Sequence, residues 1–182
     1  MKNNYLKIKV HIYKDANWFK ESRKKLFDLG KQVKWQRKGT FHQTLVFIYD
    51  DTCVKEMKKS FSEMVKKHKP FTLAINKLDA FLAGEEYIIY LTSTQHSAEM
   101  KALADDARAL VKDMGGNTDD REFKPHITLG RIPANAISLT DLKSILSTIK
   151  LREFKCQLNQ VEYVYKKEKR GERERLIGKW EL

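Results

Sequence analysis

The chain has 182 residues, of which 41% are hydrophobic and 33% are charged. This length and composition suit one globular domain with a substantial core, and they exclude a disordered or collagen-like chain. The formal net charge of +12 favours an acidic partner such as a nucleic acid, although the charge alone does not identify that partner.

The two cysteines, Cys53 and Cys156, form no CxxC pair, so we expect neither a disulfide scaffold nor a structural zinc site. The N-terminus passes directly into alternating lysines and apolar residues, with no apolar leader. No apolar run has the length of a membrane span. We therefore expect a protein of the reducing cytoplasm that does not associate with membranes.

In the first half of the chain, alternating apolar and polar residues indicate strands, and apolar residues at helical spacing indicate helices. Gly30 is a natural end for the first helix, and Pro70 ends the second. The predicted elements are strands over 5–13, 41–49 and 71–78, with helices that begin after the capping residues Asp15 and Asp51.

The second half of the chain repeats these patterns and adds a C-terminal hairpin with a turn near Gly171. Gly115 and Gly116 end its first helix, and Ser138 with Asp141 forms a capping box for its second. The predicted elements are strands over 87–92, 125–132, 158–165 and 175–182, with helices that begin at Ser97 and Ser138.

The order strand, helix, strand, helix, strand therefore occurs twice, which predicts a duplicated unit. Val10 and His42 are 32 positions apart, and Leu91 and His126 are 35 positions apart. No low-complexity linker separates the two copies, so we expect one domain with approximate halves 1–82 and 83–182.

Each half contains a His-x-Thr sequence followed by leucine, at His42 and Thr44 and again at His126 and Thr128. Residues two apart on a strand point to the same face, so each histidine shares a face with its threonine. Strict alternation would place Phe41, Gln43, Leu45 and Phe47 on the opposite face of the first strand, and Ile127 and Leu129 on that of the second.

Two imidazoles and two hydroxyls that converge on one volume suit phosphoryl chemistry without a metal. Histidine titrates near neutral pH, so one imidazole can take a proton from water while the other donates a proton to a leaving oxygen. The hydroxyls can donate hydrogen bonds to a phosphate. A single His-x-Thr is better explained by a hydrogen-bonded, half-buried strand histidine, but two copies in matching halves favour the functional interpretation.

These paired motifs resemble the 2H phosphoesterase superfamily, and within it the bacterial 2'-5' RNA ligase and RNA 2',3'-cyclic phosphodiesterase (LigT-like) branch. The resemblance extends along nearly the whole chain. It includes Trp35, Asp79-Ala80-Phe81, Phe123-Lys124-Pro125 and Trp180. It implies an α+β fold with two lobes, in which two antiparallel sheets face each other across a central cleft, helices lie outside, and the repeat is related by a pseudo-twofold axis.

The resemblance also implies roles for individual residues. His42 would be the general acid that protonates the leaving 3' oxygen, and His126 the base that activates water. Thr44 and Thr128 would hold the phosphate, and Arg131 would lie near it. Alternation alone points Arg131 away from His126, so Gly130 would need to host a bulge or bend.

The expected reaction opens the 2',3'-cyclic phosphate of an RNA end or a nucleotide and leaves a 2'-phosphate. The expected protein is a monomer that uses neither metal nor cofactor. The chain departs from the branch where Ile48-Tyr49-Asp50-Asp51 replaces Phe-Leu-Gly, and in its strongly basic loop over 31–38.

Three alternatives stay open at this stage. The same acid–base pair could join or cleave 2'-5' linkages, the fold could bind RNA or nucleotides without catalysis, or a third ligand could turn the histidines into a metal site. His68 and His96 lack partners at metal spacing, and His11 could line the cleft but is better explained as a solvated or packed histidine. The loop 31–38 and the hairpin 166–175 could contact RNA or simply be solvated, and Trp35, Tyr87 and Tyr90 could stack on bases or pack in the core.

Overall fold

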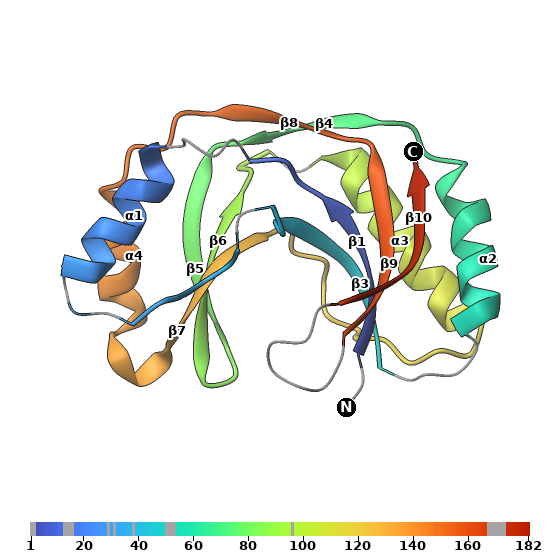
Figure 1. The fold of residues 1–182 in the computed structure, drawn as a ribbon, viewed down its shortest axis with the longest axis horizontal. Helices are drawn as coiled ribbons and strands as arrows, with labels where there is room; N and C mark the ends of the chain where they lie inside the picture. The colour runs from blue at the N-terminus through green and yellow to red at the C-terminus, as the bar shows by residue number, and fades with distance from the viewer. Residues whose placement is uncertain are drawn as a thin grey trace.

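The computed structural model describes residues 3–12, 17–28, 30, 32–37, 39–49, 54–95, 97–166 and 174–182. These residues form an arch of two lobes, with strands along its inner side and helices at its two outer ends (Figure 1). In chain order the elements are β1 (Asn3–Lys9), α1 (Asn17–Asp28), β2 (Lys34–Trp35), β3 (His42–Ile48), α2 (Val54–Val65), β4 (Phe71–Ile75), β5 (Lys77–Ala83), β6 (Glu86–Thr92), α3 (Ala98–Asp113), β7 (Ile127–Pro133), the 3-10 turn η1 (Ala134–Ala136), α4 (Leu139–Ser147), β8 (Phe154–Leu158), β9 (Gln160–Lys166) and β10 (Arg175–Glu181).

The main sheet has the strand order β10-β9-β1-β3-β7-β6-β5, all neighbours being antiparallel, and β2 pairs separately with β7. The ladder pairing of β3 with β7 is limited to one residue pair, Gln43 with Ile127, whereas the neighbouring strand pairs are matched over six or more residues. The sheet is therefore two antiparallel halves joined at one point, and β4 pairs with β8 to bridge the lobes at the top of the arch (Figure 1).

Each lobe combines elements from both halves of the chain. Helices α2 and α3 lie at the end of the arch formed by β1, β3, β9 and β10, whereas α1 and α4 lie at the end formed by β5, β6 and β7 (Figure 1). The N-terminal helix α1 thus lies in the lobe that contains β6 and β7 of the C-terminal half (Figure 1). The two-lobed α+β architecture predicted by the family resemblance is confirmed, and its lobes are interlocked rather than consecutive along the chain.

The helices form where the sequence gives them an apolar face and a cap. Ser97 and Ser138 accept hydrogen bonds from the backbone N–H groups of Met100 (3.1 Å) and Asp141 (3.0 Å), as their N-cap positions predict. The buried positions of α1 and α3 have the same spacing: Trp18, Phe19, Ser22 and Leu26 in α1, and Leu103, Ala104, Ala107 and Val111 in α3.

The structure differs from the predicted elements at several strand boundaries. The strand expected over 71–78 is two strands, because Asn76 interrupts it and binds the backbone N–H of Thr94 through its side chain (2.9 Å). The strand expected over 158–165 is also divided, between β8 and β9, and β2 was not predicted. The predicted strand residue Tyr13 and the predicted caps Asp15 and Asp51 lie outside the described residues.

Cys156 is buried in the core, and burial raises the pKa of its thiol to about 11, which makes it unreactive near neutral pH. Cys53 lies outside the described residues. Within the described ranges, every helix is too short or too polar to cross a bilayer.

Candidate active site

The two His-x-Thr motifs meet at the one point where the two halves of the sheet join. Gln43 and Ile127 are antiparallel partners, so the flanking residues place His42 beside Thr128 and Thr44 beside His126. In an ideal ladder such diagonal neighbours as the two histidines are about 7–8 Å apart, which leaves room for one phosphate between their rings. Gln43 and Ile127 are buried, and the four motif side chains lie half-buried on the opposite face.

The two imidazoles are held by equivalent hydrogen bonds, each to the carbonyl of the residue two positions before the histidine. Nδ1 of His42 lies 2.9 Å from the carbonyl oxygen of Thr40, and Nδ1 of His126 lies 2.8 Å from that of Lys124. A carbonyl can only accept, so each Nδ1 carries the proton and donates it. Nε2 of each neutral ring is then unprotonated and available to a substrate.

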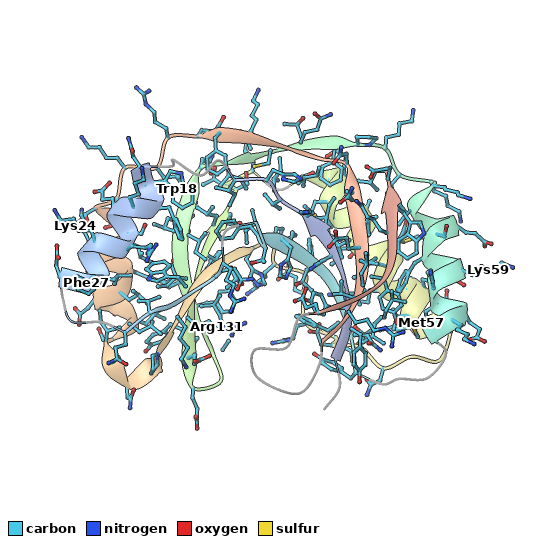
Figure 2. All side chains as sticks on the ribbon, viewed as in Figure 1. Trp18, Lys24, Phe27, Met57, Lys59 and Arg131 are labelled. Carbon is cyan, nitrogen blue, oxygen red and sulfur yellow. The ribbon has the colours of Figure 1, made fainter. Side chains whose placement is uncertain are left out.

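A β-bulge in β7 decides where Arg131 lies. Against β6, the register of β7 passes from Thr128 to Gly130 and skips Leu129. An extra residue reverses the alternation beyond it, so Arg131 returns to the face of His126 and Thr128. Figure 2 shows Arg131 on the inner side of the arch, and its guanidinium lowers the pKa of His126.

An equivalent bulge in β3 corrects the prediction for Phe47. Against β1, the register passes from Thr44 to Val46 and skips Leu45. Phe47 therefore lies on the same face as His42, where its ring packs 5.7 Å from Tyr5, instead of on the opposite face that strict alternation predicted. Phe47 occupies in β3 the position that Arg131 occupies in β7.

His126 is enclosed by aromatic rings and cations. Phe81 and Tyr90 contact its ring edge to face, at centroid distances of 5.3 and 5.9 Å. Burial is the main cause that lowers the pKa of His126, and the nearby charges of Arg131 and Arg121 lower it further, while the bond to the Lys124 carbonyl opposes them. The neutral imidazole is thus favoured, with Nε2 able to accept a proton.

His42 has an acid nearby as well as a cation. Its ring stacks on Tyr5 at 5.7 Å, and burial lowers its pKa, as do Lys7 and His126 to a smaller extent. Glu174 acts in the opposite direction and favours the protonated ring. Lys7 Nζ lies 2.6 Å from Glu174 and 3.6 Å from Glu162, and Tyr5 also donates to Glu174.

These bonds fix the charge of Glu174. Burial raises the pKa of Glu174, but the hydrogen bonds from Lys7 and Tyr5 outweigh it and hold the pKa below its usual range. These bonds therefore favour the ionised form of Glu174. No sequence pattern indicated Glu174 or Glu162, whereas the alternation of the first strand does place Lys7 on one face with Tyr5.

A cleft of about 1040 Å³ opens between the lobes at Thr44 and His126. This volume is at the upper end of the range for small-molecule sites and accommodates a nucleotide. Its lining includes the cations Lys77, Arg121 and Lys124, the aromatic residues Phe47, Phe81 and Tyr90, and the acids Asp119 and Glu122.

The remaining histidines stay outside this site where they are described. His11 is exposed, and His68 follows α2 with Nε2 3.0 Å from Asp106. His96 lies outside the described residues. Within the described ranges, no three side chains of the His, Cys, Asp and Glu types lie close enough together to hold a metal ion.

The comparisons with known proteins agree with this geometry. The family model of the 2'-5' RNA ligase superfamily matches residues 18–170, which span both motifs. The chain belongs to the 2'-5' RNA ligase superfamily. The family resemblance predicted from the paired motifs is thereby confirmed at the level of this superfamily.

Solved structures with a similar fold match the chain over nearly its whole length. TT0787 of Thermus thermophilus has a TM-score of 0.71 and 16% identity, with 100% of this chain and 98% of that chain covered. E. coli LigT complexed with 3'-AMP has a TM-score of 0.67 and 17% identity, with 98% of each chain covered. Kluyveromyces marxianus Usb1 is more distant, with a TM-score of 0.59 and 9% identity over 96% of this chain and 97% of that one. No curated protein sequence matches the chain.

Proposed function

We propose that this superfamily member hydrolyses the 2',3'-cyclic phosphate of RNA ends or nucleotides to a 2'-phosphate, without a metal ion. The observation that carries the proposal is the equivalent pair of Nδ1–carbonyl bonds at His42 and His126, which leaves two Nε2 atoms available on one face of the sheet. The structure of E. coli LigT complexed with 3'-AMP supports a nucleotide as the occupant of the cleft.

The proposed step needs one neutral and one protonated imidazole. Nε2 of His126 takes a proton from water, and the water oxygen forms a bond to phosphorus. The bond from phosphorus to the 3' oxygen breaks, and that oxygen receives the proton from Nε2 of His42. The products are a 2'-phosphate and a free 3' hydroxyl, and exchange of one proton with solvent restores both rings.

Local charges support this assignment of roles. Among the described residues whose charges act on His42, only Glu174 favours the protonated ring, whereas Arg131 and Arg121 both favour neutral His126. The hydroxyls of Thr44 and Thr128 lie beside the rings and can donate to the non-bridging oxygens. Arg131 adds positive charge where the transition state gains negative charge.

With a 5' hydroxyl in place of water, the same acid–base pair would form a 2'-5' linkage from the same cyclic end, so 2'-5' ligation is a second activity of the same groups. A nucleotide binder without catalysis is the alternative function, because the basic and aromatic lining of the cleft would bind a nucleotide even without turnover.

The test is to incubate 2',3'-cyclic mononucleotides and RNA with cyclic ends with the protein in EDTA, and to identify the product by phosphorus NMR. We expect turnover that EDTA leaves unchanged and a 2'-phosphate product. The double variant His42→Ala/His126→Ala controls for contaminating nucleases. A 3'-phosphate product, loss of turnover in EDTA, or tight binding without turnover would each contradict the proposal.

A further inference from the structure

A second groove, of about 780 Å³, lies along α1 on the side away from the histidine pair. Its inner side includes buried Phe19 and half-buried Trp35, whose rings meet edge to face with centroids 5.5 Å apart. Its exposed side includes Arg23, Lys24 and Phe27. The groove thus combines aromatic surface with positive charge outside the active-site cleft.

Phe27 is the most exposed large hydrophobic residue of the described ranges, with 80% of its surface accessible. The fold does not need it for packing. The buried positions of α1 match those of α3 in spacing, with Leu26 equivalent to Val111, so Phe27 corresponds to the exposed Lys112. An aromatic ring at a solvated helix position is available to stack on another flat group.

The charged residues of α1 that line the groove are all cations, since the acids Glu21 and Asp28 are not among the lining residues. Lys20, Arg23, Lys24 and Phe27 follow the spacing that places residues on one stripe. The acid Glu21 lies on a neighbouring stripe, where it pairs with Lys25 at 3.1 Å. The described residues that line the groove include no acid, so the groove is complementary to an anionic ligand.

The groove is connected to the active site through β2. Trp35, which lines the groove, pairs with Gly130, and Lys34 pairs with Arg131. The groove therefore borders β7, the strand that follows the second motif histidine. Glu86 pairs with both Lys34 (3.1 Å) and Arg131 (3.9 Å). Two cations and one acid give this group of three side chains a net positive charge. Figure 2 shows Phe27 and Lys24 on the outer side of the lobe that carries Arg131 on its inner side.

We propose that this groove binds the single-stranded RNA chain that carries the reacting phosphate, several nucleotides away from that phosphate. A nucleobase stacks on Phe27, and backbone phosphates contact Arg23 and Lys24. Phe27 and Lys34, which pairs with Arg131, can lie at most about 25 Å apart, so a strand of several nucleotides is long enough to span that distance. The inference rests on the proposed function for the identity of that strand.

The kinetic test compares short and long substrates. We expect Phe27→Ala to leave kcat/KM for a 2',3'-cyclic mononucleotide within about twofold of the wild type, and to lower kcat/KM for a long RNA with a cyclic end by at least about fivefold, the loss of one stacked base. Phe27→Trp should retain the activity on long RNA. Arg23→Glu/Lys24→Glu should act like Phe27→Ala.

The matched control is Lys58→Glu/Lys59→Glu, which makes the same charge change on exposed residues of α2 in the other lobe (Figure 2). We expect this control to affect long RNA much less than Arg23→Glu/Lys24→Glu does. Equal effects of the two double variants, or a Phe27→Ala variant that treats short and long substrates alike, would overturn the inference.

A binding test is independent of catalysis. Fluorescence anisotropy with a labelled RNA that ends in a 3' hydroxyl should show weaker binding to Phe27→Ala by at least about fivefold. The salt dependence of binding should be lower in Arg23→Glu/Lys24→Glu, by about 0.7 in log–log slope for each phosphate that the variant no longer neutralises. Polyglutamate that competes as well as RNA, with no contribution from Phe27, would identify a general polyanion surface instead. If the wild type turned over no cyclic phosphate, the proposed function would fail while this binding test still decided the groove.

Discussion

The two lobes present their histidines on the same backbone frame but surround them with different charges. Lys7 of β1 and Tyr90 of β6 occupy matching places, because each pairs with the motif threonine beside the bulge. Each also faces an acid of the next strand, Glu162 beside Lys7 and Asp79 beside Tyr90. The frame is thus repeated, whereas one lobe has a cation where the other has a phenol.

The two lobes also differ in the residue beyond each bulge and in the acids near each histidine. Beyond the bulge, β3 carries Phe47 where β7 carries Arg131. Among the described residues, only the first lobe has an acid, Glu174, whose charge favours its protonated histidine. The repeat therefore places the two imidazoles in equivalent positions, and the divergence between its copies surrounds them with different charges. In the proposed mechanism this difference distinguishes the acid from the base.

The largest expected effect is the loss of either histidine. His42→Ala and His126→Ala should each lower kcat for a cyclic phosphate by at least about 10²-fold, because each removes one partner of a proton transfer. His68→Ala, outside the cleft, is the matched control and should leave kcat almost unchanged. The measurement is steady-state kinetics on variants with wild-type thermal unfolding, and near-normal turnover without one of the two rings would contradict the paired mechanism.

The comparison of Arg131 with Phe47 gives the next largest effect. Arg131→Met should lower kcat/KM by about 10-fold or more, since a hydrogen bond from a charged group contributes about 1.5–3 kcal/mol. The Arg131 side chain is 48% exposed, so stability should change little. Phe47→Met, at the equivalent position, should lower kcat/KM by a smaller factor. Equal losses in both variants would mean that the charge of Arg131 does not act on the phosphate.

The pH profile tests the role of Glu174. Both histidines have a pKa below the ordinary value of about 6.5 in the folded protein, so the optimum of kcat/KM should lie below pH ~6.5. Glu174→Gln removes an anion that favours protonated His42, so the alkaline limb, which reports loss of the acid's proton, should move to lower pH. Glu56→Gln on α2 is the control. An alkaline limb that does not move would show that Glu174 has no influence on the proton of His42.

The smallest effect concerns stability rather than catalysis. A Cβ atom at Gly130 would lie 2.9 Å from Val33 and 3.0 Å from Trp35, because β2 pairs with β7 at this position. Gly130→Ala should therefore destabilise the fold by about 1–3 kcal/mol, as overpacking does, and lower Tm by about 2–4 °C for each kcal/mol. An unchanged Tm in calorimetry would show that β2 can move away without cost.

The sequence predicted which side chains of each motif share a face, because the two motifs are local and repeated. His-x-Thr on a strand places both side chains on one face, independently of the rest of the chain. In the structure His42 shares a face with Thr44, and His126 shares a face with Thr128. The caps at Ser97 and Ser138 were predictable for the same reason, since a cap acts within one helical turn.

Features that depend on register or on distant segments were harder to predict. Phe47 was placed on the wrong face because a bulge leaves little trace in sequence, and only Gly130 hinted at one beside Arg131. Glu174 is 132 positions from His42 in the chain (174 minus 42) and directly precedes β10, which is joined through β9 and β1 to the strand that carries His42. The interlocking of the lobes likewise follows from the packing of α1 against the opposite half, which no local pattern encodes.

The central claim is that both histidines contact one bound phosphate, and NMR of protein labelled with ¹⁵N-histidine tests it most directly. Titration with a nucleoside 2'-monophosphate should shift the Nε2 signals of His42 and His126 together, with one Kd and a stoichiometry of one. A response from only one of the two rings, or two separate binding curves, would contradict the claim.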